Sequence, residues 1–320
     1  MKKLLILAVV CALAVSVQAA NTPAKRAKTA KKPAAKPVVE FVVVEAPDYA
    51  SGKHDPQITA GLANFLEGEA KVTTMDAAQA KQEAELANVD YHFLPVYLLA
   101  KTPKALEKFE QPIKAGYIKE TGKYLILPQV SRTGVYQDKI AQPGVLEVFV
   151  MSQCPYGAMA ENLIIQAQKD GKIPADKTIK VRYIVSYDKD AQAFQSLHGS
   201  AEWEENIRQL LIAKYYPAKF WKYLEIRNQD YRSSRWDKAM KEAGINPNKI
   251  MKKFDTEGVE LLKAEAAYAD EYGMNASPSF LWEGKEQLDF GSVSQKPGLE
   301  FLNPANARQQ GGKAAPAGSC

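Results

Sequence analysis

The clearest pattern of apolar and polar positions lies between residues 145 and 185. Residues 145–151, VLEVFVM, are apolar and rich in β-branched side chains, which predicts a buried strand. Residues 156–169 carry apolar side chains at helical spacing, and Gly171 follows as a stop signal. Residues 179–185, IKVRYIV, predict a second strand. A strand, helix and strand of these lengths predict a βαβ unit with a parallel strand pair.

The rest of the second half divides into a long helical segment and a short hairpin. Residues 201–272 predict helices, which Pro217 and the stretch 244–247 interrupt. Residues 279–282 then predict a strand, Glu283 and Gly284 a tight turn, and residues 287–290 the partner strand. A short closing helix is expected near residues 297–302.

The first half has weaker signals of the same kinds. Residues 38–44, VVEFVVV, predict a strand, and residues 58–66 and 77–86 predict helices. A strand is expected at residues 94–98, followed by a hairpin over residues 116–127. About 265 residues between the two ends exceed the usual single domain of about 100–200 residues, so we expect two domains.

The start of the chain has the features of a secretory signal peptide. Two lysines precede an apolar run over residues 4–17, and small residues follow near Ala19. The run is shorter than the roughly 20 residues that a membrane span needs, which favours cleavage after about Ala19 over an uncleaved anchor. We therefore expect an exported protein, periplasmic or extracellular, with residues 1–19 removed.

Residues 20–37 form a basic linker rich in Lys, Ala and Pro, with little apolar surface to bury. The chain has a net charge of +5, but Lys2, Lys3 and six linker cations contribute eight positive charges, so the remainder carries −3. A basic nucleic-acid-binding body is therefore not expected. The linker would be a spacer or would touch an anionic membrane or wall surface.

Cysteine is sparse. Cys11 lies in the predicted signal peptide, so the exported chain keeps Cys154 and Cys320 and cannot be a disulfide scaffold. Cys154 begins the sequence Cys154-Pro155-Tyr156-Gly157, between the predicted strand and the predicted helix. Backbone N–H groups at a helix N-terminus favour a thiolate, and Pro155 suits the first helical position. The alternative is an inert core cysteine.

Together with Ser277-Pro278 before a strand and the order of the elements, this motif resembles the thioredoxin superfamily over residues 144–303. The helical insertion, at about residues 190–272, resembles that of the DsbA-like branch. The resemblance implies that Cys154 attacks disulfides, that Pro278 is cis, and that the backbone of Ser277 pairs with an extended substrate peptide.

The motif departs from the usual Cys-x-x-Cys at Gly157, so no disulfide can close within it. Cys320 is then the only other thiol that could act as a resolving cysteine within the chain. Residues 304–320 are expected to form a flexible tail, which could span tens of ångströms when extended. A disulfide between Cys154 and Cys320 is therefore reachable, although an incidental exposed cysteine is the alternative.

The first half resembles a degenerate copy of the same fold, over residues 38–143. Ala46-Pro47-Asp48-Tyr49 follows its first strand as the Cys154 motif follows the later one, and Leu94-Pro95 parallels Ser277-Pro278. We therefore predict an α/β protein of two tandem thioredoxin-like domains, of which the second carries a large helical insertion. The first lacks cysteine and could bind peptide, mediate dimerisation or support its neighbour.

Other candidate residues are weaker. His198 is interpreted as a surface or capping residue rather than a site residue. Met151, Cys154 and Met159 are soft ligands for copper(I), but the positions of the methionines favour packing. We expect no metal and no cofactor.

The leading hypothesis is an exported thiol–disulfide oxidoreductase or isomerase that forms mixed disulfides through a single thiol, Cys154. Its partners would be thiols or disulfides of proteins or peptides, or a low-molecular-weight thiol. The alternative is a redox-inert chaperone or scaffold that holds peptides, and a third interpretation is covalent tethering through Cys320. The sequence sets neither the redox direction nor the oligomeric state.

Overall fold

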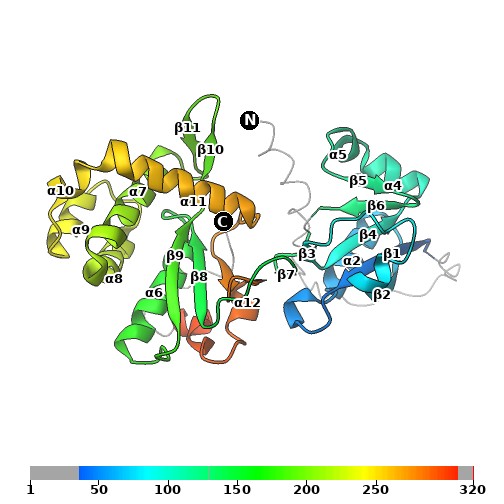
Figure 1. Ribbon diagram of the computed structural model, residues 1–320, viewed down its shortest axis with the longest axis horizontal. Coiled ribbons are helices and arrows are strands. Elements are labelled where there is room, and N and C mark those ends of the chain that lie inside the picture. Colours follow the sequence, from blue (N-terminus) through cyan, green and yellow to red (C-terminus); the bar gives the residue numbers. More distant parts are fainter. Residues whose placement is uncertain (1–35, 129, 309–319) are drawn as a thin grey trace, which may run out of the picture. The chain divides into compact units, whose positions relative to one another are not determined.

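The computed structural model describes residues 36–128, 130–308 and 320. The predicted signal peptide, nearly all of the basic linker and residues 309–319 of the predicted tail lie outside the described residues. The described residues divide into two compact units, one that ends at Asp138 and one that begins at Lys139 (Figure 1). Each unit has its own hydrophobic core.

The second unit is built on strands in the order β9–β8–β12–β13. β8 (Val145–Val150) pairs in parallel with β9 (Thr178–Tyr183), and α6 (Pro155–Lys169) connects the two. β8 also pairs antiparallel with β12 (Ser279–Trp282), which forms a hairpin with β13 (Glu286–Leu288). A βαβ half followed by a β-hairpin on the same sheet is a thioredoxin-like topology, and the segment between the halves is an insertion.

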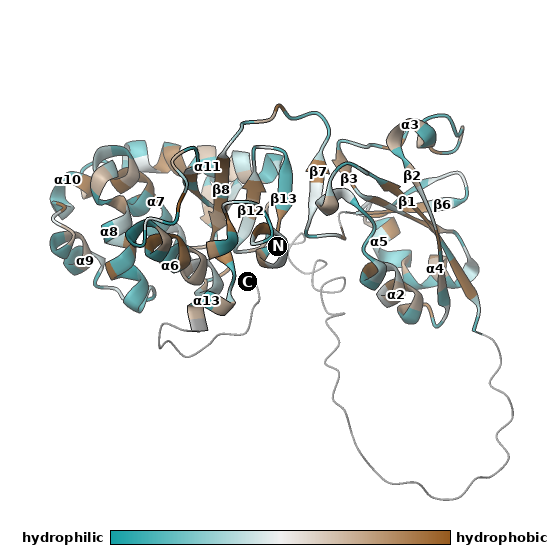
Figure 2. Ribbon diagram, turned by 90° about the horizontal axis from the view of Figure 1, so that it is seen from below, coloured by the Kyte–Doolittle hydropathy of each residue, from teal (hydrophilic) through white to brown (hydrophobic). Residues whose placement is uncertain are grey.

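The side chains of β8 alternate between two buried faces. Leu146, Val148 and Val150 enter the main core together with apolar residues of α6. On the other face the Phe149 ring stacks on Tyr268 of α11 (Val259–Glu271), with ring centroids 5.9 Å apart. Figure 2 shows the hydrophobic strands β8 and β12 among helices that carry hydrophilic residues. Because both faces are covered, the end of β8 is held firmly where α6 begins.

The first residues of the insertion form a strand and not a helix. β11 (Ala193–Gln195) pairs antiparallel with β10 (Ser186–Asp188), and the first helix begins at Ser200, next to the predicted start at residue 201. Tyr187 and Phe194 form a cross-strand aromatic pair with centroids 4.9 Å apart, and such pairs stabilise hairpins. The helices that follow are α7 (Ser200–Tyr215), α8 (Pro217–Arg227), α9 (Trp236–Glu242), α10 (Pro247–Met251), a π-helical turn (Phe254–Gly258) and α11.

A buried polar cluster joins α7 to α8. The carboxylate of Glu205 is fully buried, accepts hydrogen bonds from Arg208 Nε at 2.8 Å and Tyr223 Oη at 2.7 Å, and lies 3.2 Å from Arg227 Nε. Burial opposes ionisation of Glu205, but the two guanidinium groups outweigh it and hold the pKa of this carboxyl below its usual value. The buried charge is therefore compensated within the insertion.

The C-terminal elements also differ from expectation. Instead of one helix at residues 297–302, the structure has α12 (Phe290–Val293), which Asp289 and Ser292 cap reciprocally, and a 3-10 turn (Glu300–Leu302). A further helix, α13 (Ala305–Arg308), lies inside the stretch predicted as a flexible tail. Asn303 Oδ1 accepts a hydrogen bond from the Ala305 N–H at 2.9 Å, which favours a helix start at this position.

The first unit has strands in the order β2–β1–β4–β6–β5. β1 pairs in parallel with β2 and antiparallel with β4, and β6 pairs antiparallel with both β4 and β5. The first four strands therefore have the same order and directions as β9–β8–β12–β13. The bounds are β1 (Val38–Glu45), α2 (Pro56–Phe65), β2 (Glu69–Asp76), α3 (Ala77–Ala80), β3 (Phe93–Leu94), β4 (Val96–Ala100), α4 (Pro103–Lys108), α5 (Glu110–Lys114), β5 (Lys119–Thr121), β6 (Tyr124–Leu127) and β7 (Gly134–Tyr136), with a 3-10 turn at Ala50–Gly52.

One local prediction for this unit was wrong, and the segment after β1 differs from its counterpart in the second unit. The helix expected over residues 77–86 ends at Ala80. Leu86 is instead buried in a turn, and its backbone carbonyl accepts a hydrogen bond from Tyr91 Oη at 3.0 Å. Ala46 follows β1 but caps no helix, because α2 begins only at Pro56. The first unit thus shares the strand order of the second but does not place a helix N-terminus directly after β1.

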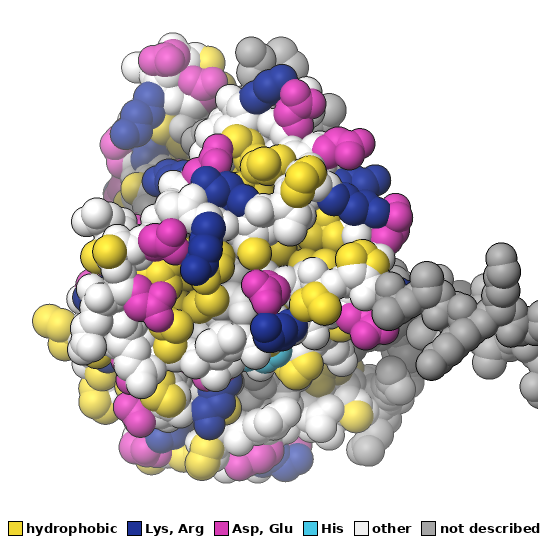
Figure 3. Space-filling model, turned by 90° about the vertical axis from the view of Figure 1, so that its right-hand side faces the viewer, with side chains coloured by type: hydrophobic (Ala, Val, Ile, Leu, Met, Phe, Trp, Pro, Cys, Tyr) yellow, Lys and Arg dark blue, Asp and Glu magenta, His cyan; other side chains and the backbone are white. Residues whose placement is uncertain are grey.

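Charged side chains of both signs are mixed over the face shown in Figure 3. In the first unit, the exposed ion pair of Lys71 with Glu40 at 2.9 Å joins the neighbouring strands β2 and β1, and Lys101, after β4, pairs with Glu120 of β5 at 3.0 Å. Exposed pairs of this kind contribute little to stability. The apolar cores of the units therefore account for most of their stabilisation.

One buried carboxyl on α6 makes stability depend on pH. Glu161 is 2% exposed, its Oε2 accepts a hydrogen bond from Asn228 Nδ2 at 2.8 Å, and its Oε1 has no hydrogen-bond partner among the described atoms. Burial raises the pKa of Glu161 from 4.5 to about 7; the Asn228 hydrogen bond opposes this shift and the Glu205 charge adds to it.

We predict that Glu161→Gln removes this pH dependence. The folded state holds the Glu161 proton more tightly than the unfolded state, so its stabilisation is complete below about pH 4.5 and is lost as pH rises to about 7. The loss corresponds to about 3 kcal/mol at most. At pH 8 the variant should therefore exceed the wild type in free energy of unfolding, and at pH 4.5 the two should be close.

Urea denaturation followed by tryptophan fluorescence measures this, because all four tryptophans of the chain lie in the second unit. The exposed Glu242→Gln is the matched control and should leave the pH profile unchanged. A Glu161→Gln profile parallel to that of the wild type would contradict the prediction.

Candidate functional site

Cys154 lies at the junction of β8 and α6. Its backbone N–H donates to the Met151 carbonyl at 2.9 Å, which closes a tight turn after β8. It is the N-cap residue of α6, Pro155 is the first helical residue, and the Ala158 N–H donates to the Cys154 carbonyl at 3.0 Å. The first turn of α6 contains no acidic residue. A sulfur at this position therefore faces the positive end of the helix dipole without a nearby opposing charge in that turn.

The sulfur of Cys154 is bonded to that of Cys320. The two residues, 166 positions apart, form a disulfide with their Cα atoms 6.1 Å apart. Cys154 is completely buried, whereas Cys320 is partly exposed. The pairing that the sequence left open is thus present in the structure.

Ser277 holds Cys320 by main-chain hydrogen bonds as well. The Cys320 N–H donates to the Ser277 carbonyl at 2.8 Å, and the Ser277 N–H donates to the Cys320 carbonyl at 3.3 Å. Two residues that exchange both bonds form an antiparallel bridge of the kind found in β-sheets. The Ser277–Pro278 peptide bond is cis, and β12 begins at the next residue.

Cys154 Sγ lies 3.4 Å from the Ser277 carbonyl oxygen. In the disulfide this is a contact and not a hydrogen bond, because the sulfur carries no proton. The same oxygen already accepts the Cys320 N–H. Ser277 therefore contacts both halves of the disulfide bridge.

The side chain of Ser277 explains why glycine stands at the fourth position of the motif. Ser277 Oγ is buried and accepts a hydrogen bond from the Met151 N–H at 2.9 Å. A Cβ added to Gly157 would lie 2.7 Å from this oxygen and 3.1 Å from the Met151 carbonyl oxygen. The space that a second motif cysteine would need is thus occupied by the hydroxyl that fixes the end of β8.

A buried carboxylate from the insertion holds the turn before Cys154. Glu202, on α7, is completely buried, and its Oε2 accepts hydrogen bonds from the Gln153 N–H at 3.1 Å and from His198 Nδ1 at 2.6 Å. Ser152 Oγ also donates to the Glu202 carbonyl at 3.1 Å. His198, interpreted from sequence as a surface or capping residue, therefore reaches the site only through Glu202.

Glu202 was missed at the sequence level. Its contact with Gln153 spans 49 positions, and an acidic residue in the first turn of a helix is common for reasons of the helix dipole alone. His198 precedes the N-cap residue Gly199, so the spacing of four residues between His198 and Glu202 is not a contact within one helix face and gave no signal either.

The remaining candidates lie outside this arrangement or at its edge. Tyr156 is a partly exposed residue of the first turn of α6, and Met159 packs against the core. In the described part of the chain, no group of three or more His, Cys, Asp or Glu side chains is placed to hold a metal ion. Among the same residues, none of the helices has the length and apolar character needed to cross a membrane.

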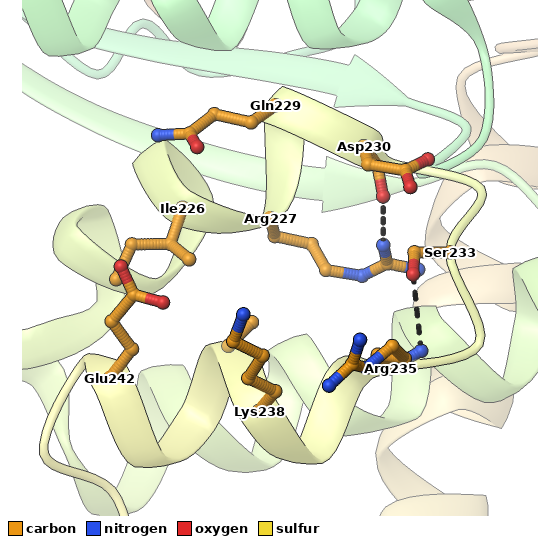
Figure 4. Close-up of a pocket in the computed structure, with 9 residues that line it drawn as sticks. Ile226, Arg227, Gln229, Asp230, Ser233, Arg235, Lys238 and Glu242 are labelled. Atoms are coloured by element: carbon orange, nitrogen blue, oxygen red, sulfur yellow. Dashed lines mark hydrogen bonds between the residues drawn. The ribbon is translucent and has the colours of Figure 1, made fainter.

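A shallow pocket in the insertion is separate from the disulfide. Figure 4 shows side chains of both charges around it, from α8, α9 and the segment between them. Arg227 donates to the Asp230 carbonyl, and the Arg235 N–H donates to Ser233 Oγ at 3.3 Å. None of the residues that line this pocket contributes to the Cys154 arrangement.

The chain is similar in fold to several solved structures at low sequence identity, among them a disulfide interchange protein and a disulfide oxidoreductase, both named DsbA. DsbA from Klebsiella pneumoniae is 16% identical with a TM-score of 0.36, and the match covers 53% of this chain and 89% of that one. DsbA from Proteus mirabilis is 14% identical with a TM-score of 0.37, covering 55% and 90%. Oxidised BdbD from Bacillus subtilis is 14% identical with a TM-score of 0.37, covering 53% and 89%. No protein-family model and no curated protein sequence matches the chain.

We predict that Gly157→Ala destabilises the second unit by about 1–3 kcal/mol, because the new methyl group overpacks the site. The better helix propensity of alanine, worth about 1 kcal/mol, acts in the opposite direction. In a Ser277→Ala background the cost should be smaller, because the oxygen nearest to the new methyl group is gone.

Urea denaturation followed by tryptophan fluorescence gives the free energy of unfolding of both single variants and of the double variant. The difference between the costs of Gly157→Ala in the two backgrounds is the coupling energy between the two positions. Gly291→Ala is the matched control, since its added Cβ would meet Asp289 Oδ1 only at 3.4 Å, an ordinary contact. Equal costs of Gly157→Ala in the two backgrounds would show that the Ser277 hydroxyl does not limit the space.

Proposed function

We propose that the protein is an exported thiol–disulfide exchange protein that acts through mixed disulfides at Cys154. The observation that carries the proposal is the Cys154–Cys320 disulfide, placed at the N-terminus of α6 and against the backbone of Ser277. Cys154, Pro155, Tyr156 and Gly157 form the reactive segment, Ser277 and Pro278 form the substrate-binding edge, and Cys320 is the resolving thiol.

The reduced site would act as follows. The Cys154 thiolate attacks one sulfur of a substrate disulfide, the substrate S–S bond breaks, and the electron pair leaves on the other substrate sulfur. The Cys320 thiolate then attacks the Cys154 sulfur of the mixed disulfide. The second substrate sulfur leaves as a thiolate, and the Cys154–Cys320 disulfide forms. One substrate disulfide is thereby reduced to two thiols, and the two cysteines of the protein are oxidised to the Cys154–Cys320 disulfide.

Three features support a reactive cysteine over an inert one. The N-terminus of α6 favours the thiolate that must leave or attack. Glu202 and Ser277 Oγ hold the turn around Cys154 on both sides. The main chain of Ser277 exchanges two hydrogen bonds with Cys320, which is the pairing that an extended segment would use.

We expect Cys154→Ser to abolish mixed-disulfide formation with a disulfide-bonded peptide, because the only other described thiol, Cys320, lacks the α6 N-terminus. Cys320→Ser should still form the mixed disulfide but should release product more slowly, because resolution then needs an external thiol. Mass spectrometry of acid-quenched samples measures both.

The outcome that counts against the proposal is a reduced Cys320→Ser protein in which Cys154 neither reacts with the peptide disulfide nor is alkylated. That result would favour the second candidate, a redox-inert peptide-holding protein. The specific observation in its favour is the antiparallel main-chain bridge at Ser277, which can bind an extended segment without any sulfur chemistry. If the protein only holds peptides, Cys154→Ser would bind an extended peptide as well as the wild type does.

A further inference from the structure

The Cys320 bridge carries an inference that rests on the proposed function and concerns the regulation of the same site. Cys320 is held in three ways at once: by the disulfide to Cys154, by its N–H to the Ser277 carbonyl at 2.8 Å, and by its carbonyl to the Ser277 N–H at 3.3 Å. A disulfide alone needs only the sulfur. The two main-chain bonds fix the backbone of Cys320 as an added strand residue beside the start of β12.

This geometry is what a substrate cysteine would need in a mixed disulfide with Cys154. Its sulfur would be bonded to Cys154, and its backbone would lie in extended form against Ser277. We propose that Cys320 is a tethered substrate analogue: the Cys154–Cys320 disulfide is an internal mixed disulfide that closes the site until an external thiol opens it.

The two sulfurs of this disulfide differ in how easily an incoming thiol can attack them. Cys154 is completely buried, whereas Cys320 is partly exposed. Cys154 also sits at the N-terminus of α6, so it is the better leaving group, and a better leaving group departs faster. Both access and leaving-group stability direct attack to the sulfur of Cys320.

Opening of the disulfide needs only external thiols. An external thiolate attacks Cys320 Sγ, the Cys154–Cys320 bond breaks, and its electron pair remains on Cys154 as a thiolate. The products are a mixed disulfide between Cys320 and the external thiol and a free Cys154 thiolate at the helix N-terminus. A second external thiolate attacks the external sulfur of that mixed disulfide and releases Cys320 as a thiol after protonation.

The main-chain bonds would let residue 320 compete with a substrate peptide for the Ser277 backbone even without its sulfur. Cys320→Ser keeps the backbone N–H that donates to Ser277, whereas Cys320→Pro lacks it. Neither variant can form the disulfide. The pair therefore separates the effect of the main-chain bridge from that of the sulfur.

The test has two arms on the full chain. In the first, oxidised wild-type protein is mixed with glutathione, quenched with acid at early times and mapped by mass spectrometry. We expect the first glutathione adduct on Cys320 with Cys154 free. A first adduct on Cys154 with Cys320 free would overturn the proposed direction of attack.

In the second arm, the alkylation rate of Cys154 by N-ethylmaleimide is compared between reduced Cys320→Ser and Cys320→Pro. We expect Cys154 to react about 2- to 10-fold faster in Cys320→Pro, because one hydrogen bond that holds residue 320 against Ser277 is lost. Equal rates would refute the tethered analogue while the proposed function stands. Absence of alkylation in both variants would instead refute the proposed function.

Discussion

Ser277 is the residue on which the arrangement around Cys154 depends. Its hydroxyl accepts the Met151 N–H, its carbonyl lies against Cys154 Sγ, and its two main-chain groups pair with Cys320. A completely buried serine is costly unless its polar atoms are satisfied, and here each of them has a partner. One residue before β12 therefore joins the end of β8, the start of α6 and Cys320.

The rest of the second unit keeps these segments in place. β8 and β12 pair antiparallel, so the turn after β8 and the residue before β12 meet at the same edge of the sheet. α7 adds Glu202, which holds the backbone of Gln153 from the opposite side. The helical insertion thus contributes directly to the geometry of the site, and the first unit, which lacks an equivalent helix start after β1, does not reproduce it.

The sequence predicted the parts of this site that depend on local pattern. Strand β8, helix α6 and strand β12 follow from apolar periodicity, and Cys154 and Pro155 fall at a helix start because proline suits that position. Contacts between distant segments left no such signal. The bridge between Ser277 and Cys320 links a residue before a proline to a Gly- and Ala-rich stretch without periodicity, and Gly157 marks the absence of a second cysteine but not the hydroxyl that fills its place. The β10–β11 hairpin was not predicted, because strands of only three residues leave too short a pattern to recognise.

The central claim is that Cys320 occupies the Cys154 site in the oxidised protein. Disulfide mapping of the protein, isolated with free thiols trapped by alkylation, tests it most directly. We expect one cross-linked peptide pair that joins Cys154 to Cys320 of the same chain. Recovery of Cys154 alkylated, or joined to another molecule while Cys320 is free, would contradict it.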